Sequence, residues 1–464
     1  MQRYEVAIIG SGPAGYVGAI TASRAGLPTC LIEKDVFGGV CLNKGCIPTK
    51  ALVASAKLLR NMRRASEFAL NLEGTVSVSA VNLRDRISRI LDIERKGLRK
   101  LVEASGTDII QGHASFLDHN TLKVRGANGD LTIHSKNVII ATGSKPASLP
   151  FLPFDGEKVV SSDDLLHLDR IPESMIIIGG GYIGCEFASI FSSLGTYVKI
   201  IEAMPRLLLN VDEDIVSVLS REFKKSNIDM RVGSHIVGAK VADKVTVTLE
   251  DGSDISADIC LVAVGRQPSA EGLDLDKVGV KLLPNGAIEV NNHMMTNVPG
   301  IYAAGDVVGN PMLAHVASAE CKVAVGNIAG NRLLMDYTVI PSGIFTYPEI
   351  GSIGMTESQA RDAGMEVKTG TVLLRSLGIS HASGEIVGMA KIVADGLSDA
   401  IVGIHIIGER ATDLVHEVAV AMFGGMTAST LGQVVHAHPT FSEMVGESAE
   451  AVNNESIYVT RKAA

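Results

Sequence analysis

The sequence predicts an α/β protein made of two parallel-sheet units and a C-terminal α+β domain, and three observations support this. First, an apolar run followed by G-x-G-x-x-G occurs twice, at residues 6–15 and 175–184. Second, each copy is followed by a helix-like stretch and a second apolar run that ends in an acid, Glu33 or Glu202, 23 residues after the first glycine. Third, strand-like runs at 387–393 and 401–408 and an amphipathic helix pattern at 413–423 follow the change of character near residue 346.

The two glycine motifs have the spacing of a dinucleotide-binding turn. Glycines let the backbone approach a pyrophosphate, the following helix N-terminus faces its charge, and the acid accepts hydrogen bonds from a ribose. One copy would be weak evidence, but two copies with the same acid spacing favour two Rossmann-like units over ordinary glycine-rich turns. The expected cofactor contacts are therefore Gly10, Gly12, Gly15 and Glu33 in the first unit, and Gly179, Gly181, Gly184 and Glu202 in the second.

A second pair of matching segments marks the ends of the two units. Residues 138–146 (V-I-I-A-T-G-S-K-P) parallel residues 260–268 (C-L-V-A-V-G-R-Q-P), and each is a buried-strand run stopped by glycine and proline. A later strand at 301–306 ends in A-A-G-D and suggests that the first unit resumes after the second. We therefore expect a first dinucleotide-binding domain over 1–146, a second inserted over 147–270, a central region over 271–345 that completes the first, and a C-terminal interface domain over 346–464.

Composition excludes several classes of function. The 464 residues carry 42 Lys and Arg against 51 Asp and Glu, a net charge of −9, and lack a long basic run, so binding to nucleic acid is not expected. No uncharged apolar stretch reaches the length of a membrane span. The N-terminus runs straight into a strand pattern and leaves no room for a targeting peptide, so we expect a cytoplasmic protein.

Two of the six cysteines, Cys41 and Cys46, lie directly after the first unit's acid. In a regular helix, residues five positions apart lie about 8.6 Å apart at Cα, whereas a disulfide needs about 4.4–6.8 Å. Because Gly45 permits a backbone distortion and Pro48 removes a donor, we expect a distorted turn that leads into a helix through Lys50. The N-terminus of that helix would favour a thiolate.

The cysteine pair has three interpretations. A metal site would need further thiols or imidazoles at ligand spacing, and since none lie nearby, we expect no metal. Two unconnected core thiols would fit the usual burial of free cysteine. A reversible redox disulfide explains more, because it accounts for the position of the pair beside a nucleotide site.

The segment G-G-V-C-L-N-K-G-C-I-P-T-K resembles the active-site signature of the flavin-dependent pyridine nucleotide–disulfide oxidoreductases, in detail that of their dihydrolipoamide-oxidising branch. The resemblance covers nearly the whole chain in the family's order. It runs from the first glycine motif through the cysteine pair, A-T-G at 141–143, the second glycine motif and A-A-G-D to H-P-T-F-S-E at 438–443. It implies FAD in the first domain and NAD in the second.

The resemblance also implies roles for individual residues. Cys46 would face the flavin, and Cys41 would exchange with substrate. Lys50 would lie near the flavin, paired with Glu186. His438, oriented by Glu443 and supplied by the other subunit of a homodimer, would be the base, and His436 would be structural. Further expected cofactor contacts are Ala114, Ala141, Thr142, Gly143, Gly265, Asp306, Met312, Leu313, Ala314 and His315.

The activity implied is oxidation of protein-bound dihydrolipoamide, with electrons passing through the cysteine pair and FAD to NAD⁺. The lipoyl group would belong to a protein of a 2-oxoacid dehydrogenase or glycine-cleavage system. Glu202 favours NAD, because a carboxylate repels the 2′-phosphate of NADP, although Arg206 offers a cation nearby. The alternatives are an NAD(P)H-dependent reductase of another small disulfide and a non-catalytic docking protein. Lys44, expected to face solvent, and Cys321, expected to be buried and inert, depart from the family's pattern without putting the fold in doubt.

Overall fold

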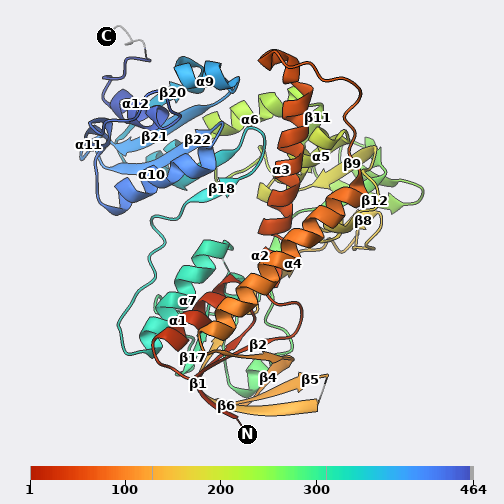
Figure 1. Ribbon diagram of the computed structural model, residues 1–464, viewed down its shortest axis with the longest axis vertical. Coiled ribbons are helices and arrows are strands. Elements are labelled where there is room, and N and C mark those ends of the chain that lie inside the picture. The colour runs from red at the N-terminus through yellow and green to blue at the C-terminus, as the bar shows by residue number, and fades with distance from the viewer. Residues whose placement is uncertain (1, 128, 310, 460–464) are drawn as a thin grey trace.

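The computed structural model describes residues 2–127, 129–309 and 311–459 (Figure 1). The first sheet has seven strands in the order β3-β2-β1-β6-β5-β4, with β17 also paired to β6. Its strands are β1 (Gln2–Ile9), β2 (Thr29–Glu33), β3 (Asp108–Gln111), β4 (His113–Asp118), β5 (Thr121–Gly126), β6 (Gly129–Ile140) and β17 (Ile301–Ala303). β17 follows the second unit in the chain yet pairs in parallel with β6, so the second unit is inserted into the first, as predicted.

Helices α1 (Pro13–Arg24), α4 (Ala80–Ala104) and α7 (Ala314–Ile328) accompany the first sheet. Small residues let α1 and α7 approach closely: a Cβ added at Gly18 of α1 would lie 2.3 Å from the Cys321 sulfur of α7. Cys321 is fully buried there, and burial raises the pKa of its thiol to about 12. The structure therefore places Cys321 as a packing residue, as expected.

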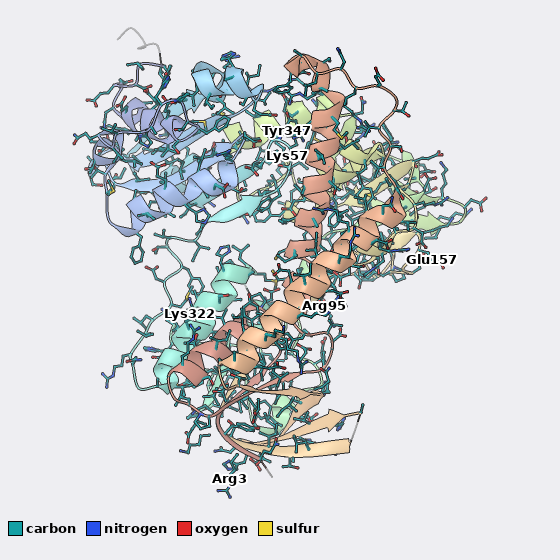
Figure 2. All side chains as sticks on the ribbon, in the orientation of Figure 1. Arg3, Lys57, Arg95, Glu157, Lys322 and Tyr347 are labelled. Carbon is teal, nitrogen blue, oxygen red and sulfur yellow. The ribbon has the colours of Figure 1, made fainter. Side chains whose placement is uncertain are left out.

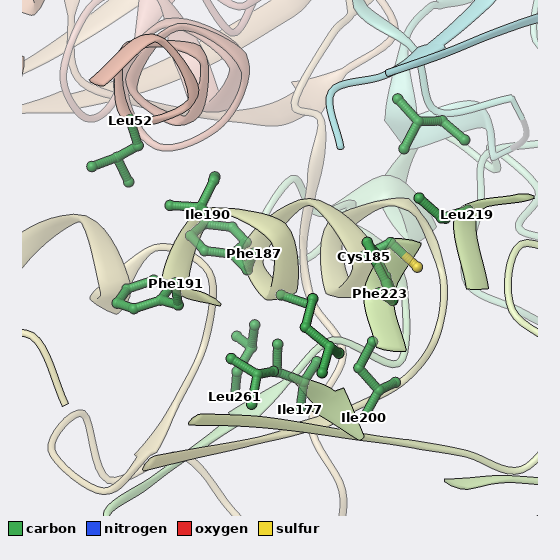
Figure 3. Close-up of a cluster of buried hydrophobic side chains, with 14 of the residues drawn as sticks. Leu52, Ile177, Cys185, Phe187, Ile190, Phe191, Ile200, Leu219, Phe223 and Leu261 are labelled. Atoms are coloured by element: carbon green, nitrogen blue, oxygen red, sulfur yellow. The ribbon is translucent and has the colours of Figure 1, made fainter. Parts of the chain in front are cut away.

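The second sheet has the order β11-β10-β9-β15-β8 and is parallel throughout. Its strands are β8 (Val159–Val160), β9 (Ser174–Ile178), β10 (Tyr197–Glu202), β11 (Ile228–Val232) and β15 (Ile259–Val262); helices α5 (Tyr182–Leu194) and α6 (Glu213–Lys225) and a small sheet of β12 (Ile236–Val241), β13 (Val245–Leu249) and β14 (Asp254–Ala257) accompany it. Figure 3 shows the core between α5 and the sheet, where Phe187 and Phe191 lie above Ile177 and Leu261. Burial on both faces explains why β9 and β15, the central strands, are nearly continuous apolar runs.

The two units are joined by a pair of short strands. β7 (Ser144–Pro146) and β16 (Arg266–Pro268) form an antiparallel pair in which Arg266 lies opposite Pro146. These are the last residues of the two matching segments identified in the sequence. The repeat therefore brings the ends of the two units into contact with each other.

The C-terminal domain contains an antiparallel sheet in the order β18-β19-β22-β21-β20. Its strands are β18 (Ser342–Ile344), β19 (Ile350–Gly354), β20 (Val367–Leu373), β21 (Met389–Asp395) and β22 (Ile401–Ile407), and its helices are α8 (Glu357–Asp362), α9 (Gly378–Ser383), α10 (Ala411–Phe423), α11 (Ala428–Gly432) and α12 (Glu443–Val452). The predicted strands and helix of this domain are present, with ends shifted by one or two residues.

Two further helices, α2 (Gly39–Asn43) and α3 (Cys46–Arg63), connect the first unit to the other two domains. In Figure 1, α3 stands between the second unit and the C-terminal domain, above the first sheet. Short 3-10 turns occur at η1 (Ala65–Phe68), η2 (Asp164–His167), η3 (Leu275–Lys277), η4 (Asp306–Val308) and η5 (Leu374–Ser376). None of the helices in the described residues combines the length and hydrophobicity that a membrane span requires.

A buried ion cluster joins the second unit to the C-terminal domain. The Lys391 ammonium of β21 lies 3.0 Å from Asp212 and 2.7 Å from both Asp214 and Glu357. The side chains of Lys391 and Asp212 are only 5% and 3% exposed. Removing the lysine would leave Asp212 as an uncompensated buried charge, whereas the Asp214 side chain is 60% exposed to water.

The Lys391→Met variant is therefore expected to be less stable by about 3–5 kcal/mol, because Asp212 would remain buried without its cation. The change would appear as a lower urea midpoint in denaturant unfolding. Lys368→Met is the matched control, because Lys368 is exposed on neighbouring β20. Equal midpoints for the two variants would contradict this account of the cluster.

Candidate functional site

A cavity of about 640 Å³ lies where the three domains meet. Residues from the first unit, the second unit and the C-terminal domain all line it. The predicted site residues among them are Gly10, Gly12, Glu33, Cys41, Cys46, Lys50, Ala114, Ala141, Thr142, Gly143, Glu186, Asp306, Met312, Leu313 and Ala314. These residues are spread over some 300 positions of the sequence, and the fold brings them together around one cavity.

The other expected cofactor contacts are not among the lining residues. Gly15 is not in the lining but packs beneath it, since a Cβ there would lie 1.7 Å from the Gly10 carbonyl oxygen. His315 is also outside the lining, because its ring nitrogen Nε2 lies 2.8 Å from the Pro341 carbonyl oxygen. Glu202 and Gly265 belong to the second unit and are not among the lining residues, although Arg266, the residue after Gly265, is.

The first glycine motif is shaped by a close approach of β1 and β6. Gly10 has a φ of +104°, and a Cβ there would lie 2.3 Å from the Ala141 carbonyl oxygen. Both observations require glycine at this position. α1 then begins at Pro13, so its N-terminal amides face the cavity where an anion is favoured.

The acid after β2 is held in place by the glycine loop itself. One oxygen of Glu33 accepts hydrogen bonds from the Ser11 amide, 2.8 Å away, and the Ser11 hydroxyl, 2.6 Å away. Its other oxygen accepts from the Asp35 amide at 2.8 Å. The carboxylate is therefore oriented at the edge of the cavity before any ligand arrives.

The second unit repeats this arrangement. Gly179 has a φ of +108°, and a Cβ there would lie 2.4 Å from the Ala263 carbonyl oxygen. Glu202 accepts hydrogen bonds from the amides of Gly180, at 2.5 Å, and Met204, at 2.7 Å. Gly181 and Gly184 take the positions of Gly12 and Gly15, with Gly181 immediately before α5 and Gly184 packed against the Gly179 carbonyl oxygen.

The cavity fits a polar dinucleotide. Three of its lining residues, Asn43, Thr142 and Asp163, each have a buried side-chain oxygen without a hydrogen-bond partner in the protein. Buried polar atoms are nearly always paired, so these oxygens suit a ligand that carries donors. Together with the α1 N-terminus and Glu33, they match the pyrophosphate and hydroxyl groups of FAD.

The two cysteines lie on different helices. Cys41 belongs to α2, which ends at Asn43, and Cys46 is the first residue of α3. Lys44 and Gly45 separate the helices, with Gly45 in a non-helical conformation (φ −130°, ψ −108°). The expectation that one regular helix does not hold both cysteines is confirmed, although the distortion is a complete break rather than a bent first turn.

The thiols of the pair have different acidities. A hydrogen bond from the Cys41 thiol and the charge of Lys50 lower the pKa of Cys46 to about 7. The same hydrogen bond and burial raise the pKa of Cys41. The position of Cys46 at the start of α3 also favours its thiolate. When the reduced pair loses one proton, these effects therefore favour the negative charge on Cys46 over Cys41.

The Lys50 ammonium makes the ion pair that the resemblance implied. Its Nζ lies 3.0 Å from each oxygen of Glu186, whose side chain is only 9% exposed. The Phe345 amide donates a third hydrogen bond to Glu186 at 2.9 Å. Lys44, by contrast, is half-exposed and lies 3.9 Å from Asp35, at the mouth of the cavity.

His438 and Glu443 are also in contact. His438 Nδ1 lies 2.8 Å from Glu443, which accepts a second hydrogen bond from the Thr440 amide at 2.9 Å. Although burial raises the pKa of Glu443, the hydrogen bonds from His438 and Thr440 outweigh it and lower that pKa. The His438 side chain is 70% exposed and does not line the cavity of its own chain. His436, by contrast, contacts its own chain, with Nε2 lying 2.6 Å from a carboxylate oxygen of Glu417.

Sequence reasoning missed Ser144, which contacts Asp306, and Arg266, which contacts Ser144 and lies 4.0 Å from the Asp306 carboxylate. The Ser144 hydroxyl donates a hydrogen bond to the Asp306 carboxylate, and Arg266 Nε donates to the Ser144 oxygen at 2.7 Å. Both residues line the cavity. They stand in the paired strands β7 and β16, so the repeat that marked the ends of the two units was the available signal.

Comparisons with known proteins agree with this geometry. Residues 4–321 match the family model described as pyridine nucleotide-disulphide oxidoreductase, and residues 340–449 match the dimerisation domain of the same family. A dihydrolipoyl dehydrogenase of Bacillus subtilis is 39% identical over 446 residues, covering 96% of this chain and 97% of the relative. One from Chlamydia muridarum is 38% identical over 451 residues, covering 97% and 96%.

Solved structures show the same similarity. The crystal structure of LpdA from Mycobacterium tuberculosis has a TM-score of 0.90 at 26% identity and covers 97% of this chain and 99% of that chain. The flavoprotein disulfide reductase RclA from Escherichia coli has a TM-score of 0.86 at 27% identity and covers 96% and 99%. The chain belongs to the pyridine nucleotide–disulphide oxidoreductase family, and FAD and NAD, the expected cofactors, are those of its dihydrolipoyl dehydrogenase members.

Replacing Gly10 with alanine is expected to abolish retention of FAD, because the new Cβ would collide with the Ala141 carbonyl oxygen and distort the glycine loop. The measurement is the flavin-to-protein absorbance ratio of the purified variant. Gly97→Ala in α4 is the control, since nothing lies within 4 Å of its Cβ, and it should retain the parent ratio. A fully flavinated Gly10→Ala protein would show that the loop tolerates a side chain.

Proposed function

We propose that the chain is a dihydrolipoyl dehydrogenase, which oxidises protein-bound dihydrolipoamide to lipoamide and reduces NAD⁺. The observation that carries this proposal is the placement of Cys41 and Cys46, at the break between α2 and α3, in the same cavity as the first glycine motif and the Lys50–Glu186 pair. The relatives that bear this name align with nearly the full length of the chain.

The chemistry of the pair follows from the acidities of its thiols. A substrate thiolate attacks the Cys41 sulfur of the Cys41–Cys46 disulfide, and the S–S bond breaks with its electron pair on Cys46. The lowered pKa of Cys46 makes it the better leaving group. The second substrate thiolate then attacks the substrate sulfur bound to Cys41, which closes the lipoyl disulfide and releases Cys41. FAD, when bound, supplies the two-electron chemistry between the reduced pair and the nicotinamide.

The thiol of dihydrolipoamide must lose a proton before it attacks. With Nδ1 held by Glu443, His438 presents Nε2 as the nitrogen that accepts this proton. His438 is exposed and does not line the cysteine cavity of its own chain. The chain carries the family's dimerisation domain, and we propose that each active site of a homodimer combines one chain's cysteines with the partner's His438.

The second unit is suited to NAD rather than NADP. Glu202 is oriented by two amides at the position where it would meet a ribose hydroxyl. Arg206, the cation that could have met a 2′-phosphate, donates instead to the carbonyl oxygens of Leu208, Leu209 and Val211. Its guanidinium is therefore committed to the loop after β10.

The partner we propose is a lipoyl-bearing protein of a 2-oxoacid dehydrogenase or glycine-cleavage system. This proposal rests on the name that the relatives carry. A cytoplasmic location suits the enzyme, because a reducing compartment keeps sparse cysteines available for exchange rather than locked in structural disulfides.

The first test adds dihydrolipoamide to the anaerobic flavoprotein and then NAD⁺, with NADH formation followed by absorbance. We expect turnover with NAD⁺ to exceed that with NADP⁺. Glu202→Ala should lower kcat/KM for NAD⁺ about tenfold or more, the loss expected for a hydrogen bond to a charged group. Reduction of the cysteine pair by dihydrolipoamide should be unchanged in this variant. A flavoprotein that dihydrolipoamide leaves oxidised would refute the substrate, and an NADP⁺ preference would refute the role of Glu202.

The shared active site is tested by mixing two inactive variants, Cys46→Ser and His438→Ala. A mixed dimer holds one site with both residues intact only if the cysteines and the histidine come from different chains. After subunit exchange we expect about a quarter of the parent activity, because half of the dimers are mixed and each has one working site. If the two residues acted within one chain, the mixture would stay inactive.

A further inference from the structure

A segment of the C-terminal domain that directly follows β18 lies along α5. The Phe345 amide donates to Glu186 at 2.9 Å, and two residues later the Tyr347 amide donates to the Ser189 hydroxyl oxygen at 2.9 Å. Glu186 and Ser189 are one turn apart on α5, so the two amides contact the same face of that helix. These two hydrogen bonds attach the segment to α5.

The other side of the segment contacts α3. The guanidinium of Arg60, on α3, lies 3.0 Å from the centroid of the Tyr347 ring. Figure 2 shows Tyr347 close to Lys57, which is also on α3. Lys57, Arg60 and Tyr347 all line a small cavity between α3, α5 and the C-terminal domain. The segment therefore lies between the helix that begins at Cys46 and the helix that carries Glu186.

Phe345 makes two contacts with the Lys50–Glu186 pair. Its amide holds the Glu186 carboxylate, and its ring lies under the Lys50 ammonium, 4.4 Å from Nζ to the ring centroid. That distance is within the range of a cation–π interaction, which is stronger where the cation is partly desolvated. Lys50 thus has a carboxylate and an aromatic face as neighbours.

We propose that Phe345 is a positioning residue for the redox pair: its ring holds Lys50 where the ammonium stabilises the Cys46 thiolate. This inference rests on the proposed redox role of Cys41 and Cys46. It makes the domain that bears the dimer interface part of the machinery around the thiols, because Phe345 belongs to that domain.

The electrostatics around Cys46 explain why the ring matters. Lys50 lowers the pKa of Cys46, whereas Glu186 raises it. The two charges have opposite effects on the pKa of Cys46, so the stability of its thiolate depends on the distance between the Lys50 ammonium and the Cys46 sulfur. Without the ring, Lys50 would gain water and move more freely, while Glu186 would still be held by the Phe345 amide. The thiolate would then lose part of its stabilisation.

The test measures the acidity of Cys46 without dihydrolipoamide or NAD⁺. In a Cys41→Ser background, whose hydroxyl still donates a hydrogen bond, the reduced holoenzyme is treated with iodoacetamide across a pH series. Alkylation of the Cys46 peptide is quantified by mass. Phe345→Leu should raise the midpoint by roughly half a pH unit, about a threefold loss of thiolate at pH below the midpoint. Phe345→Tyr should keep the parent midpoint.

A double-variant cycle separates this role from packing. In a Lys50→Gln background, Phe345→Leu should cause no further shift, because the cation that the ring holds is gone. An unchanged midpoint in Phe345→Leu, or an equal shift with and without Lys50, would overturn the proposal. Phe345→Met provides a second non-aromatic side chain if the leucine variant does not fold. Because no lipoyl substrate is used, a wrong substrate assignment would leave this result interpretable.

Discussion

The placement of the Cys46 thiol depends on α3, a helix held by ion pairs to both other domains. Lys50 pairs with Glu186 of the second unit. Lys57 and Arg64, the residue that directly follows α3, pair with Glu409 and Glu385 of the C-terminal domain at 2.6 and 2.9 Å. Several of these side chains are mostly buried, where charged contacts are less screened than on the surface. Cys46 is the first residue of this helix, so the three domains together determine where its sulfur lies.

This arrangement gives the two copies of the dinucleotide unit different tasks. Both use a glycine with positive φ pressed against a neighbouring strand end, and both hold an acid with loop amides. In the first unit, however, the chain continues from the acid into α2 and α3, which place the cysteines in the cavity. After the corresponding acid of the second unit, the loop is instead stabilised by Arg206. The same fold therefore leads into the cysteine-bearing helices in one copy and into a loop held by Arg206 in the other.

Local sequence patterns predicted much of the site because its parts correspond to short motifs, even though the contacts between those parts are long-range. Short motifs of a few residues indicate each part: a glycine that must approach a strand, an acid at the end of the next strand, and a cysteine at the start of a helix. His315 shows the limit of this reasoning: it is adjacent in sequence to the lining residue Ala314, yet α7 directs its ring toward Pro341. Successive residues of a helix are rotated by about 100°, so the side chains of Ala314 and His315 point in different directions.

The sequence by itself determined the two nucleotide units, the insertion of one into the other and the pair of thiols, since each depends on motifs with a short-range physical cause. Only the tertiary structure decided which distant groups meet those motifs. The Phe345 ring beneath Lys50 and the Ser144–Arg266 contact to Asp306 join residues more than 100 positions apart. Such contacts depend on how whole domains pack, and the packing is set by the summed fit of many side chains rather than by any one segment.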